Sequence, residues 1–153
     1  MRSFGPTELL FIAWALRWTL TLTAIAFLGG GLVGIVLAIA RVSSHRAIRL
    51  LTAAAMQFVQ GLPLLILMFI CYYAPALLGY DVSAIVAAAI ALTINASAFL
   101  GAIWESALRA IPAPQWESAD ALAMTPLQTL RFVIAPQALS LIHISEPTRL
   151  RRI

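Results

Sequence analysis

The sequence predicts an all-α membrane protein, a polytopic bundle of helices that cross a lipid bilayer. Its 153 residues are 62% hydrophobic and only 10% charged, and its mean hydropathy is +0.95. A soluble domain carries about a quarter charged residues. The charges leave three long gaps, at 18–40, 50–80 and 82–104, and each can hold a helix of the roughly 20 residues that cross a bilayer. This composition excludes a disordered chain and argues against a soluble enzyme.

The first predicted span occupies residues 9–40, which hold a single charged residue, Arg17. As a helix it would measure about 48 Å, more than the bilayer's apolar core of about 30 Å. Arg17 and Trp18 therefore mark an expected membrane interface, and residues 8–16 are expected to lie along or above the membrane surface. The apolar stretch is too long for a cleaved signal peptide, so we interpret it as a span.

Two further spans are predicted at 58–78 and 83–103. Pro63 stands near the start of the second span, where its missing N–H group costs little. In the first span, Gly30 and Gly34 are four residues apart. Small residues at this spacing allow two helices to approach closely, so they predict helix packing.

The third predicted span holds two polar side chains of interest, Asn95 and Ser97. Polar groups inside a membrane either bond to a neighbouring helix or line a pathway. Helix bonding is the favoured interpretation and a substrate pathway is the alternative. The predicted spans contain no histidine or acid, and the sequence has no glycine-rich phosphate loop with a lysine. We therefore expect no catalytic residue, metal site or cofactor in this chain.

Arginines gather in the segments that follow the first and third spans. Three of them, Arg41, Arg46 and Arg49, follow the first span, and Arg109 and Arg131 follow the third. Two spans separate these segments, so both are expected on the same side of the membrane. The positive-inside rule places that side in the cytoplasm and the N-terminus outside. The arginines form no continuous basic face, so we expect no nucleic-acid partner.

Residues 105–130 form a polar segment unlike the spans. Pro112 and Pro114 end the preceding helix, and Pro114 suits the first turn of a new one. Pro126 disfavours helix in the residue before it, so the pattern predicts a short helix over 114–124. A helix of about eleven residues is marginal in water. It therefore needs a partner, or its own bundle, to cover its apolar face.

This segment resembles the EAA loop of bacterial ABC-importer permeases, in particular the branch for polar amino acids (His, Glu, Gln, Arg or opine). The family pattern is Glu-Ala-Ala, three residues, Gly, nine residues, then Ile-x-Leu-Pro. Its spacing is kept here by Glu117, Ser118, Ala119, Ala123, Val133 and Pro136. The resemblance covers about residues 9–138.

The chain departs from the family pattern at four further positions, of which Ala123 bears on the loop geometry. Ala123 stands for the family glycine, and a positive φ there would strain an alanine. Gln60, in QGLPLL, stands for the arginine of Arg-Gly-Leu-Pro. In the typical run Ala-Tyr-x-Ala-Glu-x-x-Arg, Ala102 stands for the glutamate and Glu105 for the arginine.

The resemblance implies a mechanism, a location in the bacterial inner membrane and a set of partners. In this family the short helix docks on a separate cytoplasmic ATPase that binds ATP and Mg, and closure of the ATPase dimer switches the pathway between outward and inward access. A periplasmic or lipid-anchored amino-acid-binding protein delivers the solute, and a second permease copy or homologous permease completes the assembly. The implied ATPase-coupling residues are Trp116, Glu117, Ala119, Ala123 and Met124.

Residues 131–138 are expected to begin a fourth span, after which the family pattern stops. The string that starts at Leu139, LSLIHISEPTR, resembles the translation of a sequencing-library adapter. We interpret 139–153 as a non-native tail, with a genuine basic tail on the membrane surface as the alternative. On that interpretation the chain is C-terminally truncated, with three full spans and the start of a fourth, and the importer function is that of its parent protein.

Other functions stay open on sequence grounds. The alternatives are a permease for another small solute, or a truncated fragment without function. A small structural membrane protein or a channel would not need the helix at 114–124. An intramembrane enzyme would need a polar catalytic cluster, for which Asn95 and Ser97 are too few.

Overall fold

The computed structural model describes residues 5–143, and every regular element in that range is helical. The all-α prediction is therefore confirmed for these residues. In chain order the elements are α1 (Pro6–Arg41), α2 (Arg46–Gly61), α3 (Leu64–Leu77), α4 (Ala84–Arg109), α5 (Ala113–Ala121), α6 (Pro126–Gln128), the π-helix η1 (Thr129–Ile134) and α7 (Ala135–His143).

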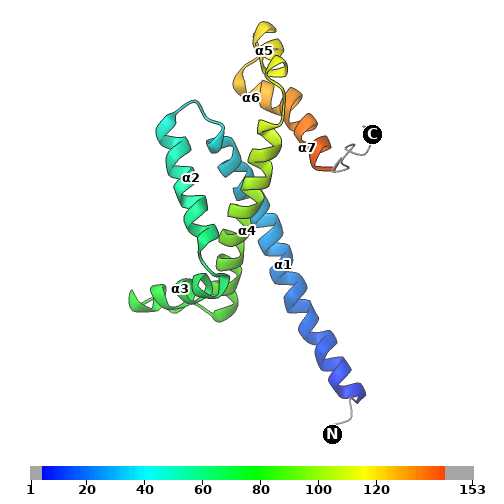
Figure 1. Cartoon of the computed structure of the whole chain (residues 1–153). Coiled ribbons are helices and arrows are strands. Elements are labelled where there is room, and N and C mark those ends of the chain that lie inside the picture. The colour runs from blue at the N-terminus through cyan, green and yellow to red at the C-terminus, as the bar shows by residue number, and fades with distance from the viewer. Residues whose placement is uncertain (1–4, 144–153) are drawn as a thin grey trace, which may run out of the picture.

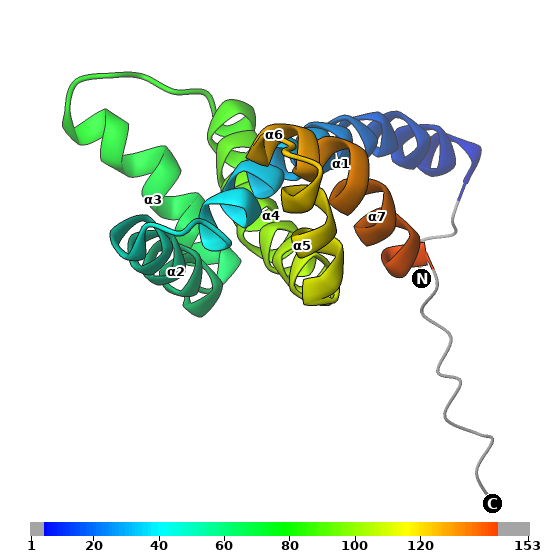
Figure 2. The same cartoon turned by 90° about the horizontal axis from the view of Figure 1, so that it is seen from above.

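The arrangement is a long pair of helices that run parallel to one another, with smaller helices around it. Figure 1 shows α1 and α4 crossing one another, with α5, α6 and α7 gathered at the end where both helices finish. Seen from that end, α2 and α3 lie to one side of the pair and α7 to the other (Figure 2). We call this end, which carries Arg41, Arg49 and Arg109, the arginine end.

The first predicted span is confirmed as a helix, but it is longer than expected. α1 runs for 36 residues without a break, which corresponds to about 54 Å. The backbone shows no bend at the interface expected near Arg17, so residues 8–16 continue the helix axis. The Arg17 guanidinium lies 3.4 Å from the centre of the Trp14 ring and 5.3 Å from that of Trp18. This cation–π cluster suits the edge of a bilayer.

The close contact predicted from the glycines of the first span is confirmed. A Cβ atom added at Gly34 would lie 2.9 Å from the backbone nitrogen of Gly101 in α4. One added at Gly30 would lie 2.6 Å from the Cβ of Ala96. Because backbone atoms meet at these two positions, only glycine lets α1 and α4 approach so closely.

The second span predicted at 58–78 is not one continuous helix in the structure. The chain forms two helices there, α2 and α3, which are bent by 103° relative to one another. Pro63 causes the break, because it lacks an N–H group and holds Leu62 in an extended conformation with φ −87° and ψ 129°. α1 and α4 are each long and apolar enough to cross a membrane, and the bent pair makes a third crossing only if it counts as one span.

The segment after α4 differs from its prediction at both ends. The helix predicted over 114–124 is α5, which begins at Ala113 and ends at Ala121. The start of the predicted fourth span, 131–138, falls in η1 and α7. α7 continues past the expected boundary at 138 as far as His143. The rest of the predicted tail lies outside the described residues.

Much of the surface is apolar. Large side chains such as Phe11, Leu32 and Leu77 are 77%, 70% and 87% exposed. A water-soluble surface does not present apolar side chains along whole helices in this way, whereas a bilayer covers them. The buried cluster lies at the arginine end and consists of Ala38, Ala107, Leu108, Ile111, Ile134 and Ala138.

Candidate functional site

The candidate site is α5 together with the helix ends beneath it. α5 projects from the arginine end of the bundle, beyond the last turn of α4 (Figure 1). Pro112 ends the preceding segment in an extended conformation and serves as the N-cap of α5. Proline also falls within the first two positions of α5, where a missing N–H group does no harm. The local sequence therefore separates α5 from α4.

The inner face of α5 packs on the bundle of its own chain. Ala119 is 1% exposed, and Trp116 packs against the buried cluster that contains Leu108 and Ile134. Both residues were predicted to couple the chain to an ATPase. Ala119 is buried and Trp116 is partly buried, so both residues contact the bundle of their own chain.

The outer face of α5 is open. Glu117 and Ala123 are exposed, and Leu122, just after the helix, is 75% exposed. Met124 is half-buried. Of the five predicted coupling residues, two therefore face outward, two face inward and Met124 lies between.

The end of α5 has the geometry of a Schellman motif. The Met124 N–H group donates to the carbonyl of Ala119 at 3.1 Å, and that of Ala123 donates to Asp120 at 2.9 Å. Ala123 takes φ +52°, the left-handed conformation that glycine usually supplies in this motif. Ala123 therefore has the positive φ that the sequence analysis identified as strained for an alanine.

The segment after α5 is tied back to it. The Thr125 hydroxyl accepts a hydrogen bond from the backbone of Gln128, whose side chain accepts one from the backbone of Thr125. This reciprocal pair is a capping box. Further along, the Gln137 amide donates to the Gln115 side chain at 3.2 Å. The hydrogen bond between Gln115 and Gln137 therefore joins α5 to α7, in addition to the packing of Trp116 on the buried cluster.

A cluster of charges that was not predicted from the sequence lies at the arginine end. The Glu105 carboxylate accepts a hydrogen bond from Arg41 Nε at 2.8 Å and from Arg109 Nε at 2.9 Å. The spacing of Glu105 and Arg109, four residues apart on one helix, is a signal that the sequence offered. The contact with Arg41, 64 residues away, depends on how α1 and α4 pack.

The two residues considered for a substrate pathway differ in their surroundings. Ser97 is 5% exposed, its hydroxyl donates to the carbonyl of Ile94 at 2.7 Å, and its backbone borders Gly34. Ser97 thus belongs to the contact between α1 and α4. Asn95 is half-buried on the same helix. The Gln60 side chain, from the end of α2, donates to the carbonyl of Ala98 at 2.9 Å, which ties α2 to α4.

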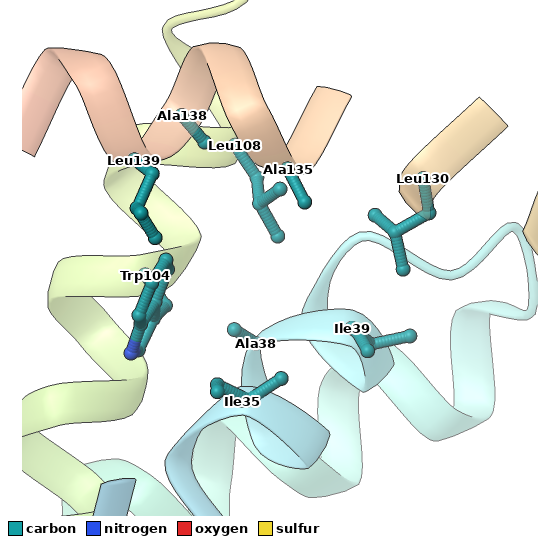
Figure 3. Close-up of a pocket in the computed structure, with 9 residues that line it drawn as sticks. All are labelled: Ile35, Ala38, Ile39, Trp104, Leu108, Leu130, Ala135, Ala138 and Leu139. Atoms are coloured by element: carbon teal, nitrogen blue, oxygen red, sulfur yellow. The ribbon is translucent and has the colours of Figure 1, made fainter. Parts of the chain in front are cut away.

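A cavity of about 220 Å³ lies between α1, α4 and α7 (Figure 3). It is lined by Ile35, Ala38, Ile39, Trp104, Leu108, Leu130, Ala135, Ala138 and Leu139. This lining has no charged side chain and would offer the ionic groups of an amino acid no partner. The cavity is therefore no candidate for an amino-acid site. Within residues 5–143, no three His, Cys, Asp or Glu side chains are grouped to hold a metal ion.

Together, two helices long and apolar enough to cross a membrane and a short helix held at one end have the features of a polytopic membrane protein. Residues 30–145 match the family described as "Binding-protein-dependent transport system inner membrane component". Because the match covers most of its length, the chain belongs to this family. The resemblance to ABC-importer permeases, drawn from the EAA-type loop, is confirmed.

Named relatives of the chain are amino-acid permeases. GlnP of Rickettsia bellii, whose name assigns it to a glutamine transport system, is 33% identical over 137 residues, which are 89% of this chain and 62% of GlnP. The L-cystine transport system permease protein TcyB of Bacillus subtilis is 29% identical over 137 residues, 90% of this chain and 57% of TcyB. The chain thus spans about three fifths of the length of these relatives.

Solved structures share the fold. One, a crystal structure of an amino acid ABC transporter with histidines, superposes with a TM-score of 0.74 at 30% identity, covering 91% of this chain and 66% of that one. The inward-facing MetNI methionine ABC transporter gives a TM-score of 0.73 at 26% identity, covering 89% and 66%. The arrangement of helices in Figure 1 is therefore similar to that in known importers.

Proposed function

We propose that this chain is the membrane-spanning permease subunit of an ATP-driven importer for polar amino acids, and that α5 docks on a separate ATPase. The observation that carries the proposal is the outer face of α5. There Glu117 is exposed and Leu122 is 75% exposed, while Trp116 holds the helix to the bundle. An exposed charge and an exposed apolar side chain, on a short helix held to the bundle by Trp116, suit a contact surface for another protein.

The proposal assigns the chemistry to partners. ATP and Mg bind to the ATPase subunit, so this chain is not itself the enzyme. A periplasmic or lipid-anchored binding protein delivers the amino acid, and a second permease copy, or a homologous permease, completes the pathway in the bacterial inner membrane. Membership of a family of binding-protein-dependent inner membrane components supports this assembly.

The orientation follows from the charges. In the proposal the arginine end faces the cytoplasm and the N-terminus lies outside. The geometry of Arg41, Glu105 and Arg109 supports it, because their hydrogen bonds bring the two arginine-bearing segments to one end of the bundle. α5 then lies on the side where ATP is available.

The solute class rests on the relatives. The names of GlnP and TcyB refer to glutamine and cystine, which supports a polar amino acid. The likeness to the methionine transporter favours a second candidate, a permease for another small solute. Competition of glutamine, cystine and methionine for uptake into vesicles that hold the assembled importer distinguishes the two.

Reversing the charge at Glu117 tests the docking surface. We expect Glu117→Arg to lower co-purification of the ATPase by about tenfold or more, because a like charge facing an interface costs several kcal/mol. The measurement is the amount of ATPase recovered with the tagged permease. The control is Asp81→Arg, which makes the same reversal at an exposed acid between α3 and α4. Unchanged recovery with Glu117→Arg would contradict the proposal.

A further inference from the structure

The Glu105 carboxylate joins three helices at the arginine end. One of its oxygens accepts from Arg41, the last residue of α1, and the other accepts from Arg109, the last residue of α4. Arg41 Nη1 also donates to the carbonyl of Arg49 in α2 at 3.1 Å, and Arg109 Nη2 donates to the carbonyl of Arg41 at 3.2 Å. A single carboxylate thus organises the ends of α1, α2 and α4.

The cluster is partly shielded from water. The Glu105 side chain is 12% exposed and that of Arg41 is 22% exposed, whereas that of Arg109 is 52% exposed. Exposed ion pairs contribute little to stability. A shielded carboxylate that accepts hydrogen bonds from two guanidinium groups forms stronger, charge-assisted bonds with defined geometry. Without Glu105, the remaining charges of Arg41 and Arg109 would repel one another.

This cluster lies under α5. Trp104 and Leu108 stand beside Glu105 and Arg109 along α4, and they pack with Trp116 of α5 in the cluster at the arginine end. Val42, which follows α1, packs there too. α5 packs mainly on η1, and through Trp116 it also packs on the buried cluster that contains Ala38 of α1 and Leu108 of α4, next to the helix ends that Glu105 joins.

We propose that Glu105 is a positioning residue that makes the ends of α1, α2 and α4 one rigid platform, so that a displacement of α5 moves the membrane helices together. This rests on the proposed function, in which α5 receives the motion of an ATPase. Position 105 holds glutamate where the family pattern has arginine, so this cluster of charges departs from that pattern.

The test compares Glu105→Gln with wild type in the importer assembled from this permease and its ATPase. We expect the amount of solute imported per ATP hydrolysed to fall about fivefold, within the range by which residues of a coupling network act. Recovery of the ATPase stays unchanged, because Glu105 lies away from the outer face of α5. Glu8→Gln is the control, since Glu8 lies in the first turn of α1, remote from the arginine end.

A second measurement reports the platform directly. Spin labels at Ser44→Cys and Ser118→Cys, with Cys71 replaced, measure the distance between the α1–α2 connection and α5. In Glu105→Gln we expect this distance distribution to broaden.

A double variant tests whether Glu105 acts through Arg41. In Glu105→Gln combined with Arg41→Gln, the loss of import per ATP is smaller than the sum of the two single losses, because both changes break one interaction.

The outcomes separate the two proposals. Loss of import per ATP together with a broadened distance supports the platform. An unchanged distance distribution overturns it, and so does a broadened one with normal import per ATP. If wild type hydrolyses ATP but imports no amino acid, the proposed function fails, and the transmission role fails with it. If wild type imports normally and Glu105→Gln does too, the platform alone fails.

Discussion

Ala123 carries a clear local conflict between residue type and backbone. It holds φ +52° at the end of α5, where the chain must turn so that Met124 can donate to Ala119. A side chain with a Cβ atom in this conformation costs roughly 1–2 kcal/mol. The turn persists because the residues around it are held from both sides, by Trp116 in the core cluster and by the capping box at Thr125.

Replacing Ala123 with glycine relieves this strain. We expect Ala123→Gly to stabilise the turn by about 1 kcal/mol, less the entropy that glycine loses on folding. Amide hydrogen exchange over residues 119–124 measures the effect as slower exchange. Ala121→Gly is the matched control, because Ala121 ends α5 without a positive φ and so has no such strain for glycine to relieve. Faster exchange in Ala123→Gly would argue against a strained alanine.

The contact between α1 and α4 is the main packing interface among the described helices. It depends on backbone-to-backbone approach at Gly30, Gly34 and Gly101, with Ser97 buried beside them. In a bilayer, helix association relies on this kind of packing, because lipid is as apolar as the side chains it replaces. The glycines therefore decide how closely the helices pack and how Arg41 reaches Glu105.

A methyl group at Gly34 should separate the two helices. Its Cβ would lie 2.9 Å from a backbone nitrogen, which cannot move aside as a flexible side chain could, so we expect Gly34→Ala to destabilise the fold by about 1–3 kcal/mol. Gly31→Ala is the control, since nothing lies within 4 Å of its added Cβ. Thermal unfolding in detergent compares the two variants. Equal unfolding temperatures would mean that this contact does not limit stability.

The whole molecule exposes more apolar surface than water would allow. Residues 10–20 of α1 and the outer faces of α3 and α4 present large apolar side chains. α1 and α4 run in the same direction, which brings the arginine-bearing segments to one end, and Asp81 precedes α4 at its other end. The structure thus defines two ends, and the membrane orientation depends on which of them faces the cytoplasm.

Labelling of cysteines tests that choice. In a variant without Cys71, we expect Asp81→Cys to react with a membrane-impermeant maleimide in intact cells, and Ser44→Cys to react only after the membrane is opened. Both positions are exposed, so accessibility on the protein itself is matched between them. The physical reason is the retention of arginine-bearing segments in the cytoplasm. The reverse pattern would place the arginine end outside.

Much of this molecule can be predicted from the sequence, because its signals are local. Charge-free stretches predict the helical class and the membrane, and the spacing from Glu117 to Pro136 predicts the family, which the family match confirms. Pro112 and Pro126 bracket α5 to within a few residues. These features depend on composition and on neighbours in the chain, so the amino-acid order alone carries them.

Other features depend on contacts between distant residues, and only the tertiary structure decides them. Pro63 signals a break in the apolar run, but the 103° angle between α2 and α3 cannot be derived from it. The inward direction of Trp116 follows from the cluster below it. The pairing of Arg41 with Glu105 arises because glycines let α1 and α4 meet closely. Sequence determines each helix separately, but only packing selects which side chains of different helices come within bonding distance.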